Sequence, residues 1–133
     1  MKVFLGGTCN NSNWRKDLIK KLKIDYFNPV VDSWDKEAYK KELIERKCCD
    51  FVLYTITPKM KGVYSIAEVV DDSNKRPHKT LFCILKDDDG AVFNDAQYLS
   101  LDRVARMVKK NGAIVMYDLD AVASYLNKNG LKE

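Results

Sequence analysis

The sequence predicts one α/β domain over residues 1–133, with three α/β/α layers and a mainly parallel sheet of about five strands, Rossmann or flavodoxin-like. Two observations support this fold class. Short apolar runs alternate with segments whose apolar residues recur at helical spacing, the order that produces right-handed βαβ units. No internal repeat, linker or low-complexity segment divides the chain, and 133 residues can bury an ordinary core without disulfides or metals.

Five apolar runs predict the strands. They share β-branched and aromatic residues and cover residues 2–5, 25–31, 50–57, 79–86 and 113–117. The run DFVLYTIT at 50–57 is the clearest of them. Pro29 predicts an edge position or an irregular course for the second strand, because proline cannot donate a hydrogen bond to a sheet ladder.

The segments between these runs predict helices. They cover residues 14–23, 33 or 35 to 48, 65–72, 97–112 and 118–130. Tyr39, Leu43 and Ile44 form the apolar side of the second helix. Within the first helix, the basic run 15–23 is expected to place its lysines on a solvated face.

Composition and charge argue against several classes of protein. The net charge of +4 comes from 23 basic and 19 acidic residues spread along the chain, so no nucleic-acid partner is predicted. No apolar run approaches the roughly 20 residues of a membrane span, and no signal peptide is recognised. The sequence therefore predicts a cytoplasmic protein with no membrane partner.

The cysteines and the histidine do not predict a metal site. Cys9, Cys48, Cys49 and Cys83 form no C-x-x-C pair, and His78 has no partner at ligand spacing. Adjacent cysteines suit a reduced cytoplasmic protein better than a disulfide framework. No metal and no other cofactor is predicted.

In an open parallel sheet, ligands bind beyond the carboxyl ends of the strands, near the point where the strand order reverses. Three polar segments follow such ends, at residues 6–13, 32–35 and 58–68. Gly6 and Gly7 in the first segment allow close approach of the backbone to a ligand. The G-x-G-x-x-G fingerprint and the phosphate loop of nucleotide triphosphatases are both absent, so a dinucleotide site is only weakly supported.

Glu68, in the third segment, has two interpretations. Ser65 and Glu68 match the S-x-x-E capping box, in which the two side chains satisfy free amides at a helix start. Alternatively, a carboxylate at this crevice is a nucleophile towards the anomeric carbon of a sugar. A further alternative is that the exposed amides around Ser65 receive a phosphate or carboxylate of a ligand. A nucleophilic thiol at Cys9 is a third alternative, for which the sequence offers no activating base.

Several motifs in a fixed order resemble the nucleoside 2-deoxyribosyltransferases, and most closely their small stand-alone members. They are FLGG at 4–7, DFVLYTITP at 50–58, and Gly62 followed by SIAE at 65–68. The resemblance covers roughly residues 2 to 86. It implies that Glu68 attacks C1′ of a nucleoside or nucleotide and holds a covalent glycosyl-enzyme intermediate, which a second base or water then resolves.

The resemblance implies a second acidic site residue. Glu42 stands eight positions before Asp50 and would hold the sugar hydroxyls or the base. A solvated helix carboxylate is the alternative interpretation of Glu42. For the whole protein, the alternative to an enzyme of nucleoside transfer or N-glycosidic hydrolysis is a non-catalytic nucleotide-binding or signal-binding module, with Glu68 serving only as a cap.

The loop before Glu68 departs from the longer members of the family, which place an aspartate there. Lys59 and Lys61 occupy this loop and favour a phosphorylated substrate, as in related nucleotide N-glycosidases. Asp32 and Asp35 are the nearest alternatives for the general acid by topology. Trp34, between them, either stacks on a base or is a half-buried structural residue.

The predicted site is therefore a catalytic pair with a surrounding set of substrate-binding residues. The catalytic residues are Glu68 and Glu42, and the binding residues are Gly6, Gly7, Asp32, Trp34, Asp35, Gly62, Tyr64 and Ser65. Tyr54 and Tyr64 are candidates for hydrogen bonding to Glu68 or the sugar. A homo-oligomer, dimer or higher, is expected, because the family completes its sites across a subunit interface.

Overall fold

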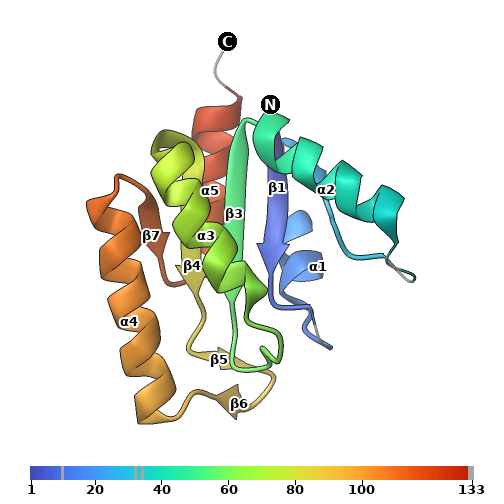
Figure 1. Ribbon diagram of the computed structural model, residues 1–133. Coiled ribbons are helices and arrows are strands. Elements are labelled where there is room, and N and C mark those ends of the chain that lie inside the picture. The colour runs from blue at the N-terminus through green and yellow to red at the C-terminus, as the bar shows by residue number, and fades with distance from the viewer. Residues whose placement is uncertain (10, 32, 34, 132–133) are drawn as a thin grey trace.

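A five-stranded sheet runs through the middle of the computed structural model, which describes residues 1–9, 11–31, 33 and 35–131 (Figure 1). Its strands are β1 (Lys2–Gly7), β2 (Asp25–Phe27), β3 (Phe51–Ile56), β4 (Thr80–Ile84) and β7 (Ile114–Met116). They lie in the order β2-β1-β3-β4-β7 and every neighbouring pair is parallel. This is the flavodoxin-like order, in which the connections reverse direction between β1 and β3. The predicted fold class is confirmed.

Helices cover both faces of this sheet. The helices α1 (Trp14–Ile19) and α5 (Leu119–Gly130) pack on one face, and α3 (Tyr64–Lys75) and α4 (Asp95–Lys110) on the other (Figure 1). The helix α2 (Lys36–Cys48) joins α3 through ion pairs of Arg46. A short 3-10 turn, η1 (Pro77–Lys79), precedes β4, and a hairpin of β5 (Asp87–Asp88) and β6 (Ala91–Val92) follows it.

The central strands are buried on both faces, as continuous apolar runs in parallel sheets are. All six residues of β3 are buried. Val3 and Leu53 belong to the cluster beneath α1 and α5, whereas Val52 and Tyr54 belong to the cluster beneath α3 and α4. The alternation of side chains along each strand therefore supplies two cores, one for each helical layer.

Several boundaries differ from those predicted. β2 ends at Phe27 instead of residue 31, so Pro29 lies in the following loop, although the predicted edge position is correct. α1 ends at Ile19 because the chain tightens into i→i+3 hydrogen bonds at Lys21 and Leu22. The predicted turn after β4 contains the small hairpin.

The apolar side of α2 does not enter the core. Tyr39, Leu43 and Ile44 are 37%, 41% and 60% exposed. The buried residue of this helix is Arg46, which sequence periodicity did not single out. No helix within the described ranges is long and apolar enough to cross a bilayer.

Gly7 closes β1 against β3 in a conformation reserved for glycine. Its φ is +122°, and a Cβ placed there would lie 2.0 Å from the carbonyl oxygen of Thr55. Gly7 is in register with Thr55, and the next residue, Thr8, donates its amide to the same carbonyl at 2.9 Å. The carboxyl ends of the two strands can meet this closely only because position 7 has no side chain.

Gly7→Ala is expected to destabilise the fold by more than about 2 kcal/mol, because the substitution combines backbone strain with overlap against a neighbouring strand. Gly62→Ala is the matched control, since Gly62 also lies in the loops of this region and a Cβ there meets nothing within 4 Å. Urea unfolding followed by circular dichroism measures both changes. Equal stability of the two variants would contradict the close-approach argument.

Candidate active site

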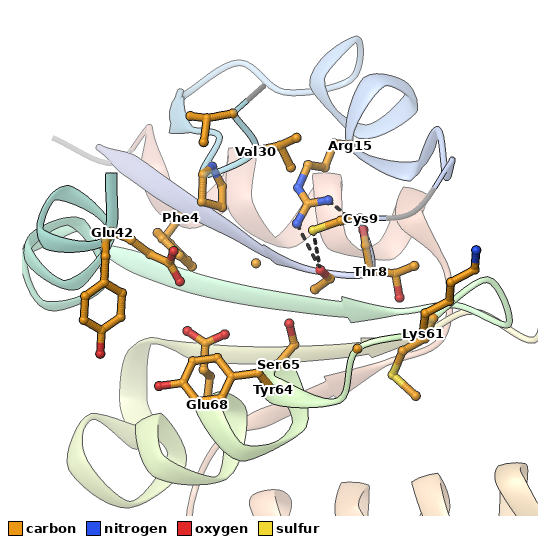
Figure 2. A pocket seen from close by; sticks show the side chains of 17 residues that line it. Phe4, Thr8, Cys9, Arg15, Val30, Glu42, Lys61, Tyr64, Ser65 and Glu68 are labelled. Carbon is orange, nitrogen blue, oxygen red and sulfur yellow. Dashed lines mark hydrogen bonds between the residues drawn. The ribbon is translucent and has the colours of Figure 1, made fainter. Parts of the chain in front are cut away.

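A cavity of about 600 Å³ opens at the carboxyl ends of β1 and β3 (Figure 2). This is the position where the strand order reverses, and the volume suits a small organic ligand. Its walls come from the end of β1, the loop after β2, α2, and the loop that leads into α3. The lining residues are Phe4, Gly6, Gly7, Thr8, Cys9, Arg15, Pro29, Val30, Val31, Tyr39, Glu42, Met60, Lys61, Gly62, Tyr64, Ser65 and Glu68.

Most of the predicted site residues meet at this cavity. Those that line it are Gly6, Gly7, Glu42, Gly62, Tyr64, Ser65 and Glu68. Asp35 lies elsewhere: its carboxylate accepts a hydrogen bond from the Ala38 amide at 2.8 Å and caps α2. Asp32 and Trp34 fall outside the described residues.

The predicted capping box at Ser65 and Glu68 is wrong. α3 begins at Tyr64, its N-cap is Val63, and no side chain caps it by a hydrogen bond. The loop therefore turns into the helix before Ser65, and Glu68 lies beyond the first turn, where no free helix amide is within its reach. Figure 2 shows the Glu68 carboxyl directed into the cavity.

Glu68 is a buried carboxyl group that lacks a full set of partners. Its side chain is only 7% exposed, and its Oε2 lies 3.3 Å from Nη1 of Arg46. Among the described residues, that buried oxygen has no hydrogen-bond partner of good geometry. Buried polar atoms are nearly always satisfied in native proteins, so an unsatisfied carboxylate oxygen in a cavity indicates a functional position.

Burial raises the pKa of Glu68 to about 7, with Glu42 adding to the rise and Arg46 opposing it. Figure 2 shows the carboxyl groups of Glu68 and Glu42 directed towards each other in the cavity. A neighbouring carboxyl group disfavours the ionised form, and this adds to the effect of burial on Glu68.

Arg46 is held behind Glu68 by buried polar groups. Its Nε donates to the hydroxyl oxygen of Tyr54 at 2.9 Å, and its Nη2 lies 3.2 Å from Oδ1 of Asp72. The Tyr54 hydroxyl in turn donates to Asp72 at 2.5 Å. Tyr54 was a candidate partner of Glu68 or of the sugar, but its hydroxyl is occupied by Asp72, and burial raises its pKa.

Arg15 forms part of the opposite wall, and the sequence prediction missed it. Its guanidinium donates to the carbonyl oxygens of Leu5, Thr8 and Gly7 at 2.9, 2.6 and 3.2 Å. Burial lowers the pKa of Arg15, because desolvation disfavours its charged form. Its helical spacing to buried Leu18 is the signal that assigns it to the inner face of α1.

The two lysines of the loop before α3 have different surroundings. Lys59 points away from the cavity, with its Nζ at 2.9 Å from Asp89 and 3.0 Å from the carbonyl oxygen of Asn11. Lys61 lines the cavity. Of the two cations that favoured a phosphorylated substrate, only Lys61 is therefore placed to meet one.

The thiol of Cys9 is the other candidate nucleophile at the cavity. Cys9 is exposed at the cavity and its thiol donates to the Gly7 carbonyl at 3.4 Å. Within the described ranges, no group of three or more histidine, cysteine, aspartate or glutamate side chains could hold a metal ion.

The fold and the cavity define a flavodoxin-like α/β protein with two carboxyl groups at its switch point, buried Glu68 and half-buried Glu42. The sequence model of the family described as nucleoside 2-deoxyribosyltransferase like matches residues 1–87. The chain belongs to this family, which confirms the resemblance inferred from its motifs. Every residue that lines the cavity lies inside the matched segment. No match was found among curated proteins.

The raised pKa of Glu68 predicts a pH-dependent contribution to stability. A carboxyl whose folded pKa of about 7 exceeds its ordinary value of 4.5 stabilises the fold fully below pH 4.5, and loses that contribution as the pH rises towards 7. Glu68→Gln stays neutral throughout. Relative to the wild type, the variant is expected to gain up to about 2 kcal/mol over this pH range.

Urea unfolding of both proteins at a series of pH values measures this difference. Glu37→Gln is the control, because Glu37 is an exposed glutamate on α2. A stability difference between wild type and Glu68→Gln that does not vary with pH would contradict the raised pKa.

Proposed function

We propose that the protein cleaves or transfers the N-glycosidic bond of a nucleoside, deoxynucleoside or nucleotide through a covalent glycosyl-enzyme intermediate on Glu68. The observation that carries this proposal is the buried Glu68 carboxyl, with an unsatisfied oxygen, beside Glu42 in the cavity at the switch point. Membership of the nucleoside 2-deoxyribosyltransferase like family makes the nucleoside class of substrate the natural one.

In the first step, the ionised carboxylate of Glu68 attacks C1′ and the bond from C1′ to the base nitrogen breaks. The bond electrons go to the base, which must gain a proton to leave easily. We assign the donation of this proton to Glu42, because its carboxyl group lines the cavity together with that of Glu68. This assigns Glu42 a proton-transfer role in place of the aspartate that longer family members carry in the preceding loop.

In the second step, a nitrogen of another base or a water oxygen attacks C1′, and the ester bond to Glu68 breaks. The attacking atom returns its proton to Glu42, so the pair ends in its starting state. Two displacements at C1′ retain the configuration of the sugar. Which acceptor reaches C1′ decides between transfer and hydrolysis.

The remaining walls suit the other parts of a nucleotide. Pro29, Val30 and Val31 offer apolar surface to a base, and the exposed ring of Tyr64 stands at the mouth. Lys61 lies on the loop wall, where its ammonium would favour a 5′-phosphate. We therefore place 5′-monophosphates among the expected substrates, beside the free nucleosides.

Glu68→Gln and Glu68→Ala are expected to lower the release of free base by roughly 1,000-fold or more, because each variant lacks the nucleophile. Chromatography over a panel of nucleosides, deoxynucleosides and 5′-monophosphates, with and without a second base, measures release and exchange. Glu37→Gln is the exposed control and should keep full activity. In addition, a nucleoside analogue with fluorine at C2′ of the sugar should leave a sugar adduct on Glu68, which mass spectrometry detects.

Turnover that survives Glu68→Ala would reject the assigned nucleophile. If the wild type binds these ligands but never releases a base, the protein is the alternative, a nucleotide-binding or signal-binding module. Loss of turnover on alkylating Cys9, with Glu68→Gln still active, would support a thiol mechanism instead.

We further infer a homo-oligomer, a dimer or a larger assembly, from exposed apolar residues around the mouth of the cavity and on α2. Val30 and Val31 are 48% and 47% exposed, Val63 and Tyr64 are 66% and 60% exposed, and Ile44 of α2 is 60% exposed. Clustered apolar side chains of this kind are usually covered by another protein surface. A second copy of the chain is the occupant that family membership favours.

Ile44→Glu is expected to shift the protein to a monomer, because it places a charge on the exposed apolar side of α2 without altering a residue that lines the cavity. Size-exclusion chromatography with light scattering measures the mass. Leu99→Glu is the matched control, since Leu99 is 54% exposed on α4. A monomeric wild type, or equal masses for wild type and Ile44→Glu, would contradict the inference.

A further inference from the structure

The structure places one cation, Arg46, directly behind the proposed nucleophile and outside the cavity lining. We propose that Arg46 is the positioning residue of the Glu68 carboxylate, and that Asp72 and Tyr54 hold Arg46 in the orientation this requires. The inference deepens the proposed function, on which it rests. It gives a reaction role to a buried cluster that does not touch the substrate.

The contacts of Arg46 leave it little freedom. Its side chain is 8% exposed, and its Nη1 faces Glu68 while its Nη2 faces Asp72. Its Nε points at the Tyr54 hydroxyl, 2.9 Å away. Because the guanidinium is planar, fixing Nε and Nη2 also fixes the direction of Nη1 towards Glu68.

Asp72 is the anchor of this arrangement. It is completely buried, and it accepts hydrogen bonds from Tyr54 at 2.5 Å and from Arg76 at 2.7 Å, besides its ion pair with Arg46. A fully buried carboxylate is costly unless it is paired. Its position one helical turn beyond Glu68 gives α3 two carboxyl groups on one side, which share a single arginine from α2.

Because Arg46 contacts three carboxyl groups, only part of its charge stabilises the ionised form of Glu68. Arg46 divides its charge among Glu68, Asp72 and the half-exposed Asp71, whose Oδ2 is 3.5 Å from Nη2. The charged or titratable groups around Glu68 are Arg46 and Glu42 from α2, Asp71, Asp72 and Tyr64 from α3, and Tyr54 from β3. Arg46 is thus a partial counter-charge: it holds Oε2 and leaves the carboxylate able to take up a proton near neutral pH.

Removal of Arg46 leaves burial and Glu42 unopposed, so Glu68 should stay protonated to a higher pH and its carboxylate should lose its fixed direction. The test compares Arg46→Gln, which removes the positive charge, with Arg46→Lys, which keeps the charge but lacks the planar guanidinium and its several N–H donors. Arg76→Gln is the matched control. It breaks an ion pair of the same Asp72 without touching Glu68.

The direct readout is the titration of Glu68, followed by NMR of ¹³C-labelled glutamate carboxyl groups and assigned by its absence in Glu68→Gln. The midpoint is expected to rise by at least one pH unit in Arg46→Gln, a tenfold loss of carboxylate at a given pH. It should move far less in Arg46→Lys, and should not move in Arg76→Gln. In the active enzyme, the acid limb of the kcat/KM profile should follow the same shifts, and Arg46→Lys should lower kcat more than it raises KM.

An unchanged midpoint in folded Arg46→Gln would overturn the inference, and so would an equal rise in Arg76→Gln. If Arg46→Gln does not fold, an Arg46→Lys enzyme with unaltered kcat overturns it in the same way. The titration needs no turnover, so the two proposals can fail separately. If the Glu68 midpoint shifts in Arg46→Gln but the wild type releases no base, only the proposed function is rejected. If the wild type releases base but the midpoint does not shift, only the role of Arg46 is rejected.

Discussion

The guanidinium of Arg46 lies within 3.5 Å of three carboxylates, and much of the molecule around the cavity is organised by that contact. It brings α2 against α3, although the apolar side of α2 remains exposed. It also reaches Tyr54, in the middle of β3, so the charge cluster crosses from the helical layer into the sheet. Packing alone would not hold α2 in this place, because its inner face is polar.

Such a cluster is a poor source of stability. Buried ion pairs lose hydration that their mutual attraction only partly returns, and well-packed apolar residues of similar size often serve a fold as well. What the cluster does supply is geometry. Arg46, Asp72 and Tyr54 fix each other through a closed set of hydrogen bonds, and the one carboxyl group left without a complete set is Glu68. A buried polar group without a full set of hydrogen-bond partners, in a network whose other members are paired, is characteristic of a reactive site.

The parts of the fold that follow from local patterns were predictable. Continuous apolar runs identified all five strands of the main sheet, and Pro29 pointed to an edge. Motif order proposed Glu68 and Glu42 as site residues, and both line the cavity. The S-x-x-E spacing misled, because the start of α3 depends on how the preceding loop leaves β3 and not on two side chains.

The residues that sequence reasoning missed have causes in tertiary structure. Arg46 and Asp72 are charged residues on helices, and ordinary experience places such residues in solvent. Only the crossing of α2 over α3 buries them together. Arg15 stood in a run of lysines and was counted with them, although its contacts are with the end of β1. Pairings between elements far apart in the chain leave no periodic signal.

The small hairpin after β4 joins the loops beside the cavity. Asp88, on β5, accepts hydrogen bonds from Ser12 at 2.5 Å and from Thr57 at 2.7 Å, which joins the loop after β1 to the loop after β3. These are the loops that lead into both walls of the cavity. Asp88 lies just past the segment that the family shares, which ends at residue 87. The spacing of these two loops therefore depends on one carboxylate beyond the matched segment, and a change at Asp88 can alter that spacing while Glu68 and Glu42 keep their places.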